Sequence, residues 1–543
     1  MLALIVLLTS GLFLIAYFKY GRFLMRQYEV NNKNPTPSHT MSDGVDYVPA
    51  HLPVLFGHHF SSIAGAGPVV GPIIAGLAFG WGPVWLWIVA GAIFFGGVHD
   101  FSALIASIRH RSRSIAEIAN IYMSRRAYLL MLAFIWLAMI YVLIVFIDLT
   151  TATFKADGGV ATSSLLFIAL AIGFGLALYR LKMPLPWASI IFVSLLFFSV
   201  WLGQQIPLNN IPALMGDPAK TWAVVLIIYC FIASVTPVWI LLQPRDYLSS
   251  YLLYSSVLAG FLGLLFGGFT LNYPVFVTWN APSLGPLFPL LFITVACGAI
   301  SGFHSIVASG TSAKQLNRET DAWPVGYGAM LLEGLVGIIA LSTVVMVTKN
   351  NPLTAKPPLA IYAAGMARFL GVFGLPEKLG ASFGLLALSS FILTTLDTAT
   401  RLARYIFQEF FNFHDKKSRY LATAVTLILP AIFSLINIRD ASGQVIPAWK
   451  IIWPVFGATN QLLAGLAMLV VSVWLKKRGK ANWFIVWPMI FMLVVTLWAL
   501  GLLIWQYKLT NIIGLIAATL FALAVLLVSE AIKSLFSKIS LTP

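Results

Sequence analysis

The chain has 543 residues, of which 59% are apolar and only 10% are charged. Because soluble globular domains carry about 25% charged residues, this composition excludes a water-soluble globular protein. The formal net charge of +16 could suggest a nucleic-acid partner, but the basic residues stand in short clusters between apolar runs. That distribution is typical of a multi-spanning protein surrounded by membrane lipid, and no nucleic-acid partner is expected.

Apolar segments long enough to cross a membrane recur along the whole chain. They are expected to be helices because lipid leaves the backbone of an open strand unsatisfied, and the alternation of a β-barrel is not seen. Residues 1–18 are interpreted as a crossing rather than a signal peptide, since no basic residues precede them. The predicted fold is all-α and polytopic, a single membrane domain over 1–543 with about fifteen crossings near 1–18, 53–79, 83–107, 127–149, 162–179, 187–203, 221–242, 249–271, 287–310, 324–347, 380–400, 420–437, 451–474, 482–505 and 512–532.

The distribution of Lys and Arg predicts the orientation of these crossings. If the N-terminus lies outside, the cytoplasmic segments hold 25 of the 34 Lys and Arg residues, and the outer segments hold the other 9. Positive charge favours the cytoplasmic side of a membrane. We therefore expect a multi-pass protein of the plasma (inner) membrane, with its N-terminus outside and its C-terminus in the cytoplasm.

The second crossing carries residues that interrupt a helix. Pro68 cannot donate a backbone hydrogen bond and so frees the carbonyl of Ala64. Gly65 and Gly67 permit non-helical backbone at the same place. The seventh crossing contains Pro237, which predicts a second interruption.

The spacing of the two interruptions predicts an inverted repeat. Crossings five apart run in opposite directions, so we expect a core of five plus five helices over 53–400, followed by accessory helices over 401–543. Freed carbonyls and half-helix ends that meet near the midplane can bind an ion or a carboxylate. The predicted substrate-binding residues are Ala64, Gly65, Ala66, Gly67 and Thr236.

Seven ordered segments carry a family resemblance. They are DGVDYVP (43–49), LFGHHFSSIAGAGPVVGPIIA (55–75), QPRDYL (243–248), CGAISGFHS (297–305), PVGYGAMLLEG (324–334), TTLDTATRLARY (394–405) and WPVFGATNQLLAG (453–465). Together they resemble the carbon-starvation (CstA) family. The resemblance implies a leucine-transporter-like fold and a transporter, not an enzyme, that takes up peptides or, in some members, pyruvate together with protons.

Ionisable and hydroxyl groups within the crossings are candidates for ion or proton coupling. Ser301, His304 and Ser305 have the spacing of one helix face. Adjacent helix positions point about 100° apart, so His99 and Asp100 fit a buried structural pair as well as a proton relay. The predicted coupling residues are Ser301, His304, Ser305, Glu333, Asp100 and His99.

A second group of charged residues falls at the cytoplasmic ends of crossings. Asp397 and Arg401 are four residues apart on one helix, which predicts an ion pair between them. Residues in these positions can close a transport path on the cytoplasmic side. The predicted gating residues are His58, His59, Arg245, Asp246, Asp397 and Arg401.

Several alternatives remain open from the sequence. The substrate is expected to be a small molecule such as pyruvate or a peptide, and the coupling ion a proton or sodium, with no cofactor and no indication of oligomeric state. A membrane haem or metal redox protein is the alternative function. It is disfavoured because the HH and HD dipeptides direct ligands to different helix faces and no HExxH or Cys/His metal spacing is present. A channel is disfavoured because nothing resembles a selectivity filter.

Overall fold

The computed structural model is nearly all helical and describes residues 1–43, 47–237, 239–413, 415, 417–438 and 445–536. Thirteen helices in this described part are long and apolar enough to cross a membrane, and the bent pair α4–α5 adds a fourteenth. The predicted all-α, polytopic fold is confirmed. The spanning helices are α1 (Leu2–Ala16) continued by η1 (Tyr17–Gly21) and α2 (Arg22–Gln27), α4 (Leu52–Ile63) with α5 (Gly67–Phe79), α6 (Trp81–Gly91) continued by η2 (Ala92–Gly96) and α7 (Gly97–Arg109), α9 (Arg125–Ala156), α10 (Gly158–Tyr179), α11 (Leu185–Gln205), α12 (Pro218–Val235), α13 (Leu242–Phe266), η4 (Glu319–Asp321) and η5 (Trp323–Gly328) continued by α18 (Ala329–Val345), α20 (Glu377–Phe410), α21 (Ser418–Leu435), α22 (Ala448–Lys477), α23 (Trp483–Tyr507) and α24 (Ile512–Phe536).

Short elements fill the remaining segments. The strands β1 (Asn280–Ala281) and β2 (Gly285–Pro286) form an antiparallel hairpin in which Asn280 faces Pro286. Three short helices, α14, α15 and α16, occupy the predicted ninth crossing. The short helices are α3 (Pro37–Thr40), α8 (Ile115–Tyr122), α14 (Leu287–Thr294), α15 (Ala296–Ala299), α16 (Phe303–Val307), η3 (Ala308–Ser312), α17 (Ala313–Gln315), η6 (Pro352–Ala355) and α19 (Pro358–Gly371).

Polar side chains define where several helices begin. The Asp157 carboxylate accepts a hydrogen bond from the backbone amide of Gly159 at the start of α10, at 2.8 Å. Asp217 does the same for the amide of Ala219 at the start of α12, at 3.0 Å. Both bonds satisfy amides that have no acceptor within the helix, so these caps fix the helix starts.

The second predicted crossing is interrupted, as expected. α4 ends at Ile63 and α5 begins at Gly67, and the two helices are bent by 44°. Between them Ala64 has φ −77° and ψ 66°, which is not helical. Pro68 stands in the first turn of α5, where a missing amide hydrogen is tolerated because the first amides of a helix lack internal acceptors.

The predicted ninth crossing is also interrupted, which the sequence interpretation did not anticipate. Ile300, between α15 and α16, is extended, with φ −163° and ψ 129°. α15 packs against α5. A Cβ atom on Gly67 would lie 2.3 Å from Sγ of Cys297, and one on Gly71 would lie 2.4 Å from the carbonyl oxygen of Thr294. The glycines therefore allow the two interrupted crossings to touch.

The prediction of an interruption in the seventh crossing is wrong. α12 is a continuous helix that ends at Val235, and Pro237 lies after its end, before α13 begins at Leu242. Proline ends a helix as readily as it interrupts one, so its presence alone does not distinguish the two cases. The interrupted crossings that meet are the second and the ninth, which lie seven apart rather than five.

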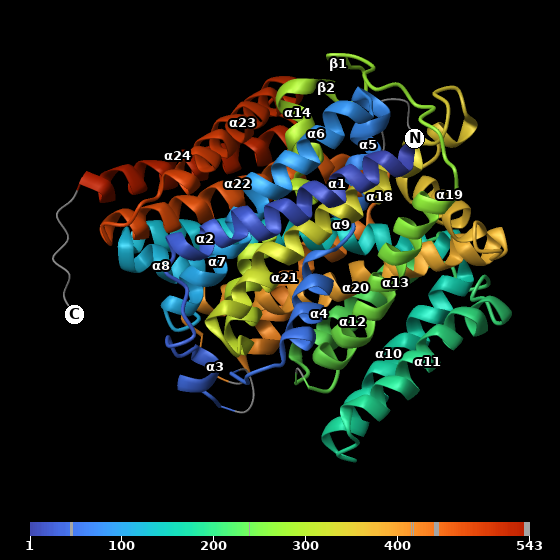
Figure 1. The fold of residues 1–543 in the computed structure, drawn as a ribbon, viewed down its shortest axis with the longest axis horizontal. Helices are drawn as coiled ribbons and strands as arrows, with labels where there is room; N and C mark the ends of the chain where they lie inside the picture. The colour runs from blue at the N-terminus through green and yellow to red at the C-terminus, as the bar shows by residue number, and fades with distance from the viewer. Residues whose placement is uncertain (44–46, 238, 414, 416, 439–444, 537–543) are drawn as a thin grey trace.

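The packing of the helices explains this difference. α9, α12, α20 and α21 pack against one another, while α18 packs against α5 and α6. α10 and α11 pair with each other at the edge of the molecule (Figure 1). In the most apolar stretch of α22 every residue is buried, whereas only 22% of the residues in the corresponding stretch of α11 are buried. With the peripheral α10–α11 pair set aside, the two interrupted crossings are five apart.

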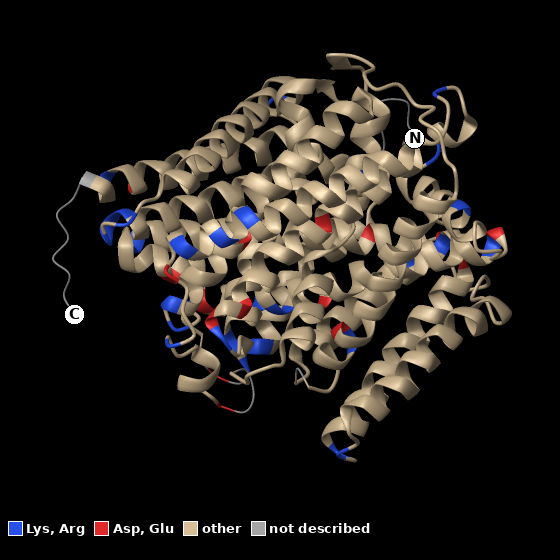
Figure 2. Cartoon of the chain, in the orientation of Figure 1, with Lys and Arg blue, Asp and Glu red and all other residues tan. Residues whose placement is uncertain are grey.

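Charged residues are unevenly distributed over this fold. Figure 2 shows long tan stretches with few charges, and many of the Lys and Arg residues toward the lower left, around α2, α3 and α8. A smaller number of acidic and basic residues lie in the middle of the helices. Such intramembrane charges are costly unless paired, so their partners define the candidate site.

Candidate functional site

A chain of four buried ionisable residues connects three segments. Oδ2 of Asp100 on α7 lies 2.7 Å from Nδ1 of His304 on α16. Its other oxygen, Oδ1, lies 2.7 Å from Nδ1 of the adjacent His99. Nε2 of His304 lies 3.1 Å from a carboxylate oxygen of Glu333 on α18, within ion-pair distance. All four residues are at most 1% exposed.

The members of this cluster, Asp100–His304–Glu333 with His99, are all groups that can bind or release a proton. Two ionised carboxylates away from water are tolerated only if positive charge compensates them. His304 supplies that charge when it is protonated, because it touches both acids. Gain or loss of one proton therefore changes the electrostatic balance of the whole cluster. Of the six predicted coupling residues, the structure brings these four together.

The remaining two coupling candidates have other partners. The hydroxyl of Ser301 bonds with the side-chain amide of Asn460 on α22. Ser305 donates to the carbonyl oxygen of Gly302, at 2.7 Å. The prediction that Ser301 and His304 share a helix face is wrong, because α16 begins only at Phe303 and Ser301 stands before it.

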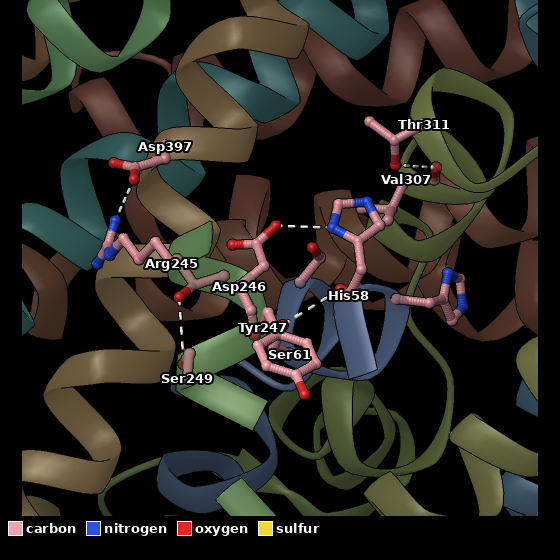
Figure 3. A network of polar contacts seen from close by, with 12 residues as sticks. His58, Ser61, Arg245, Asp246, Tyr247, Ser249, Val307, Thr311 and Asp397 are labelled. Atoms are coloured by element: carbon pink, nitrogen blue, oxygen red, sulfur yellow. Dashed lines mark hydrogen bonds and ion pairs between the residues drawn. The ribbon is translucent and has the colours of Figure 1, made fainter. Parts of the chain in front are cut away.

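The two adjacent histidines of α4 have different partners. Nδ1 of His58 lies 2.7 Å from Oδ2 of Asp246 on α13, and Figure 3 shows the two side chains directed toward each other. Nδ1 of His59 lies 2.8 Å from the hydroxyl of Ser312 in η3. Because neighbouring side chains diverge on a helix, α4 links two separate parts of the molecule.

Arg245, next to Asp246 in α13, forms a second buried charged group. It pairs with Asp397 on α20 (Figure 3). Its guanidinium also donates to the hydroxyl of Tyr229, at 2.6 Å. Tyr229 in turn donates to Asp397 at 2.6 Å. Arg245 and Asp397 are 0% and 1% exposed, so their charges compensate each other out of contact with water.

The prediction of an ion pair between Asp397 and Arg401 is wrong. Asp397 pairs with Arg245 instead, and Arg401 donates to the carbonyl oxygens of Ala233 and Thr236, both at 2.6 Å. These carbonyls belong to the C-terminal end of α12, which attracts a cation. Thr236, predicted to bind substrate, is thus a partner of Arg401 in the turn after α12 and is not part of the interrupted second crossing.

A small cavity lies where the two interrupted crossings meet. Its volume is about 20 Å³, which is room for about one water molecule. Gly65 and Gly67 of the second crossing, Cys297 and Ser301 of the ninth, and Asn460 of α22 contribute to its wall. Sequence reasoning placed substrate near 64–67, but it assigned Asn460 no part in the site. The available signal was an Asn-Gln pair in the middle of an apolar segment.

Comparison with known proteins places the chain in a family. A model of "Carbon starvation protein CstA" matches residues 1–356 and 347–499. The chain belongs to the CstA family. Its relatives include the peptide transporter CstA of Campylobacter jejuni, 32% identical over 98% of this chain and 84% of the relative. The pyruvate/proton symporter BtsT of Escherichia coli is 32% identical over 92% of this chain and 81% of the relative.

This protein is therefore a CstA-type transporter, as its motifs predicted, and the redox alternative is not favoured. The backbone is also similar to a solved structure of the manganese transporter of Eremococcus coleocola, with 14% identity, a TM-score of 0.47, and coverage of 91% of this chain and 99% of that chain. A similarity of this degree supports no statement about substrate or site.

Proposed function

We propose that this CstA-type transporter takes up a small carboxylate such as pyruvate, or a small peptide, across the plasma membrane together with protons. The observation that carries the proposal is the position of His304. It lies four residues after the extended Ile300, in contact with both Asp100 and Glu333. The relatives described above include a peptide transporter and a pyruvate/proton symporter, which supports both substrate classes and proton coupling.

The proposed substrate site is the junction of the interrupted crossings at Ala64–Gly67 and Ser301. Pro68 has no amide hydrogen, and the amide of Val69 donates to the carbonyl oxygen of Ala66. The amides proposed to bind the substrate carboxylate are therefore those of Ala66 and Gly67, at the start of α5. In the structure the cavity at this junction is about 20 Å³, smaller than a molecule of pyruvate, so the junction cannot hold the substrate in this conformation. Substrate entry requires the junction to open.

Coupling follows from charge. A proton on the His304 cluster adds positive charge close to the place proposed for the substrate carboxylate. Each then binds more tightly in the presence of the other, and this reciprocal effect couples the two movements. Carbonyl and hydroxyl oxygens at the same junction also suit sodium, which is the competing coupling ion.

The second charged group supplies the proposed cytoplasmic gate. The His58–Asp246 contact ties α4 to α13, and the Arg245–Asp397 pair ties α13 to α20. Both contacts must break or rearrange if these helices separate. We propose that they hold the path closed on the cytoplasmic side in the conformation described here.

Uptake into proteoliposomes tests the proposed function. Labelled pyruvate and labelled dialanine are offered with an inward pH gradient, with a sodium gradient, or with neither. We expect accumulation of at least one substrate above equilibrium under the pH gradient, and its loss when a protonophore collapses that gradient. Accumulation that follows sodium alone would contradict proton coupling, and absence of uptake of both probes would contradict the proposed substrates.

We also propose an extent and an orientation for the transport core. The ten core crossings would be α4–α5, α6–α7, α9, α12, α13, α14–α16, α18, α20, α21 and α22, with α10–α11 as an insertion. This core extends beyond the limit at residue 400 that the sequence suggested. The N-terminus is proposed to lie outside, since that choice places most Lys and Arg residues in the cytoplasm.

Cysteine labelling in intact cells tests the orientation. Asn280→Cys, in the exposed β1–β2 hairpin, is expected to react with a membrane-impermeant maleimide from outside. Arg478→Cys, exposed after α22, should react only after permeabilisation. The parent chain is the control, because Cys230 is buried and Cys297 only half-buried. The reverse labelling pattern would invert the assignment.

A further inference from the structure

The interruption of the ninth crossing leaves backbone groups that need partners. Extended backbone at Ile300 removes the helical acceptors for the amides just after it. One residue of another helix, Asn460 of α22, takes their place. Its carbonyl oxygen accepts from the amide of Gly302 at 3.0 Å, and its side-chain Oδ1 accepts from the amide of Phe303 at 3.0 Å.

The same side chain also orders the cavity wall. Nδ2 of Asn460 donates to the hydroxyl of Ser301 at 3.0 Å and to Sγ of Cys297 at 3.1 Å. The orientation of the amide is fixed because the Phe303 amide must donate, so Oδ1 faces it and Nδ2 faces Ser301. Asn460 is 5% exposed, and it lines the cavity together with Ser301 and Gly65.

Close packing makes this arrangement specific. A Cβ atom on Gly302 would lie 2.4 Å from the backbone nitrogen of Ala464 and 2.4 Å from the carbonyl oxygen of Asn460. α22 therefore approaches the interruption as closely as the backbone allows. Aspartate in place of Asn460 would keep the acceptor but lose the donor to Ser301, and alanine would lose both.

We propose that Asn460 is a positioning residue of the substrate site: it sets the extended backbone at 300–302 and directs the Ser301 hydroxyl toward the junction with Gly65–Gly67. α22 thereby belongs to the site and is not an accessory helix. This inference rests on the proposed location of substrate at that junction, and it does not depend on which ion drives transport.

The neighbouring residue provides a matched control. Gln461 is on the same helix, is 0% exposed, and carries the same amide group. Neither its Oε1 nor its Nε2 has a hydrogen-bond partner within the described residues. Substitution at Gln461 thus removes a buried amide from α22 without removing a hydrogen bond to the interrupted crossing.

The experiment measures the kinetics of uptake in proteoliposomes, with labelled pyruvate or dialanine, whichever the wild type transports. The variants are Asn460→Ala, Asn460→Asp, Ser301→Ala, the double variant S301A/N460A, and Gln461→Ala. We expect Asn460→Ala and Ser301→Ala each to raise KM by about tenfold with kcat changed by less than about twofold. The double variant should be no worse than Asn460→Ala alone, since both changes remove one interaction. Gln461→Ala should leave KM unchanged.

Other outcomes distinguish the positioning role of Asn460 from the proposed location of the substrate. If Ser301→Ala raises KM but both Asn460 variants leave it unchanged, the positioning role is overturned and the substrate location stands. If neither residue affects KM, the substrate location itself fails. If Asn460→Ala and Asn460→Asp both fail to fold while Gln461→Ala folds, Asn460 is a stability residue and the inference is overturned.

Discussion

Replacing His304 with Ala is expected to abolish proton-driven accumulation of substrate while the protein stays folded. Among the described residues, His304 alone lies within ion-pair distance of both Asp100 and Glu333. Without it Glu333 loses its ion-pair partner and Asp100 keeps only the contact with His99, so no single cation is shared between the two acids. Coupling free energies of about 1–3 kcal/mol correspond to changes of 5–150-fold, so accumulation should fall by about tenfold or more.

The measurement compares two modes of transport in proteoliposomes. Accumulation under an imposed pH gradient should be lost in His304→Ala, whereas exchange of labelled for unlabelled substrate, which needs no net proton movement, should remain. His39→Ala is the control, because His39 is exposed and bonds to Asn317 outside the cluster. Wild-type accumulation by His304→Ala would rule this residue out as the coupling group. Equal loss of both modes together with a lowered thermal transition would indicate a structural histidine.

The parts of the fold that follow from local chemistry could be predicted from the sequence. Length and hydropathy determine the spans, and the glycines and Pro68 of the second crossing determine its interruption. The ninth interruption could not be predicted in the same way. No proline lies at Ile300–Gly302, and the break there is stabilised by Asn460, which is 160 residues away in sequence from Ile300.

The partners of buried charges were harder to predict than their locations. Asp397 and Arg401 have the spacing of a helical ion pair, yet Asp397 pairs with Arg245 of another helix. An exposed pair at that spacing is worth only about 0.2–0.5 kcal/mol. Arg245 is fully buried, and a buried charge without a partner costs several kcal/mol. The larger energy of pairing Arg245 with a carboxylate therefore determines that Asp397 pairs with Arg245 and not with Arg401. Such a preference depends on tertiary contacts that spacing along one helix does not reveal.

Arg245→Met is expected to lower the free energy of unfolding by about 3–5 kcal/mol, the usual cost of leaving one buried charge without its partner. Asp397 would then keep only the Tyr229 hydroxyl, which donates to it at 2.6 Å. The double variant R245M/D397L should recover most of the loss, because it removes both charges. The midpoint of thermal unfolding in detergent measures both effects.

Lys155→Met serves as the control for this comparison. Lys155 pairs with Asp217 at 3.3 Å, but the two side chains are 59% and 40% exposed, so the change should cost less than about 1 kcal/mol. A double variant as unstable as Arg245→Met alone would show that the pair does more than neutralise charge.

The stable double variant also distinguishes a gate from a structural clamp. If the Arg245–Asp397 pair holds α13 against α20 to close the cytoplasmic path, R245M/D397L should release preloaded substrate from proteoliposomes faster than the wild type in the absence of any gradient. The apolar pair restores packing but has no directional bond to hold the two helices in register. Release at the wild-type rate by a fully stable double variant would assign the pair to folding alone and leave His58–Asp246 as the remaining contact of the proposed gate.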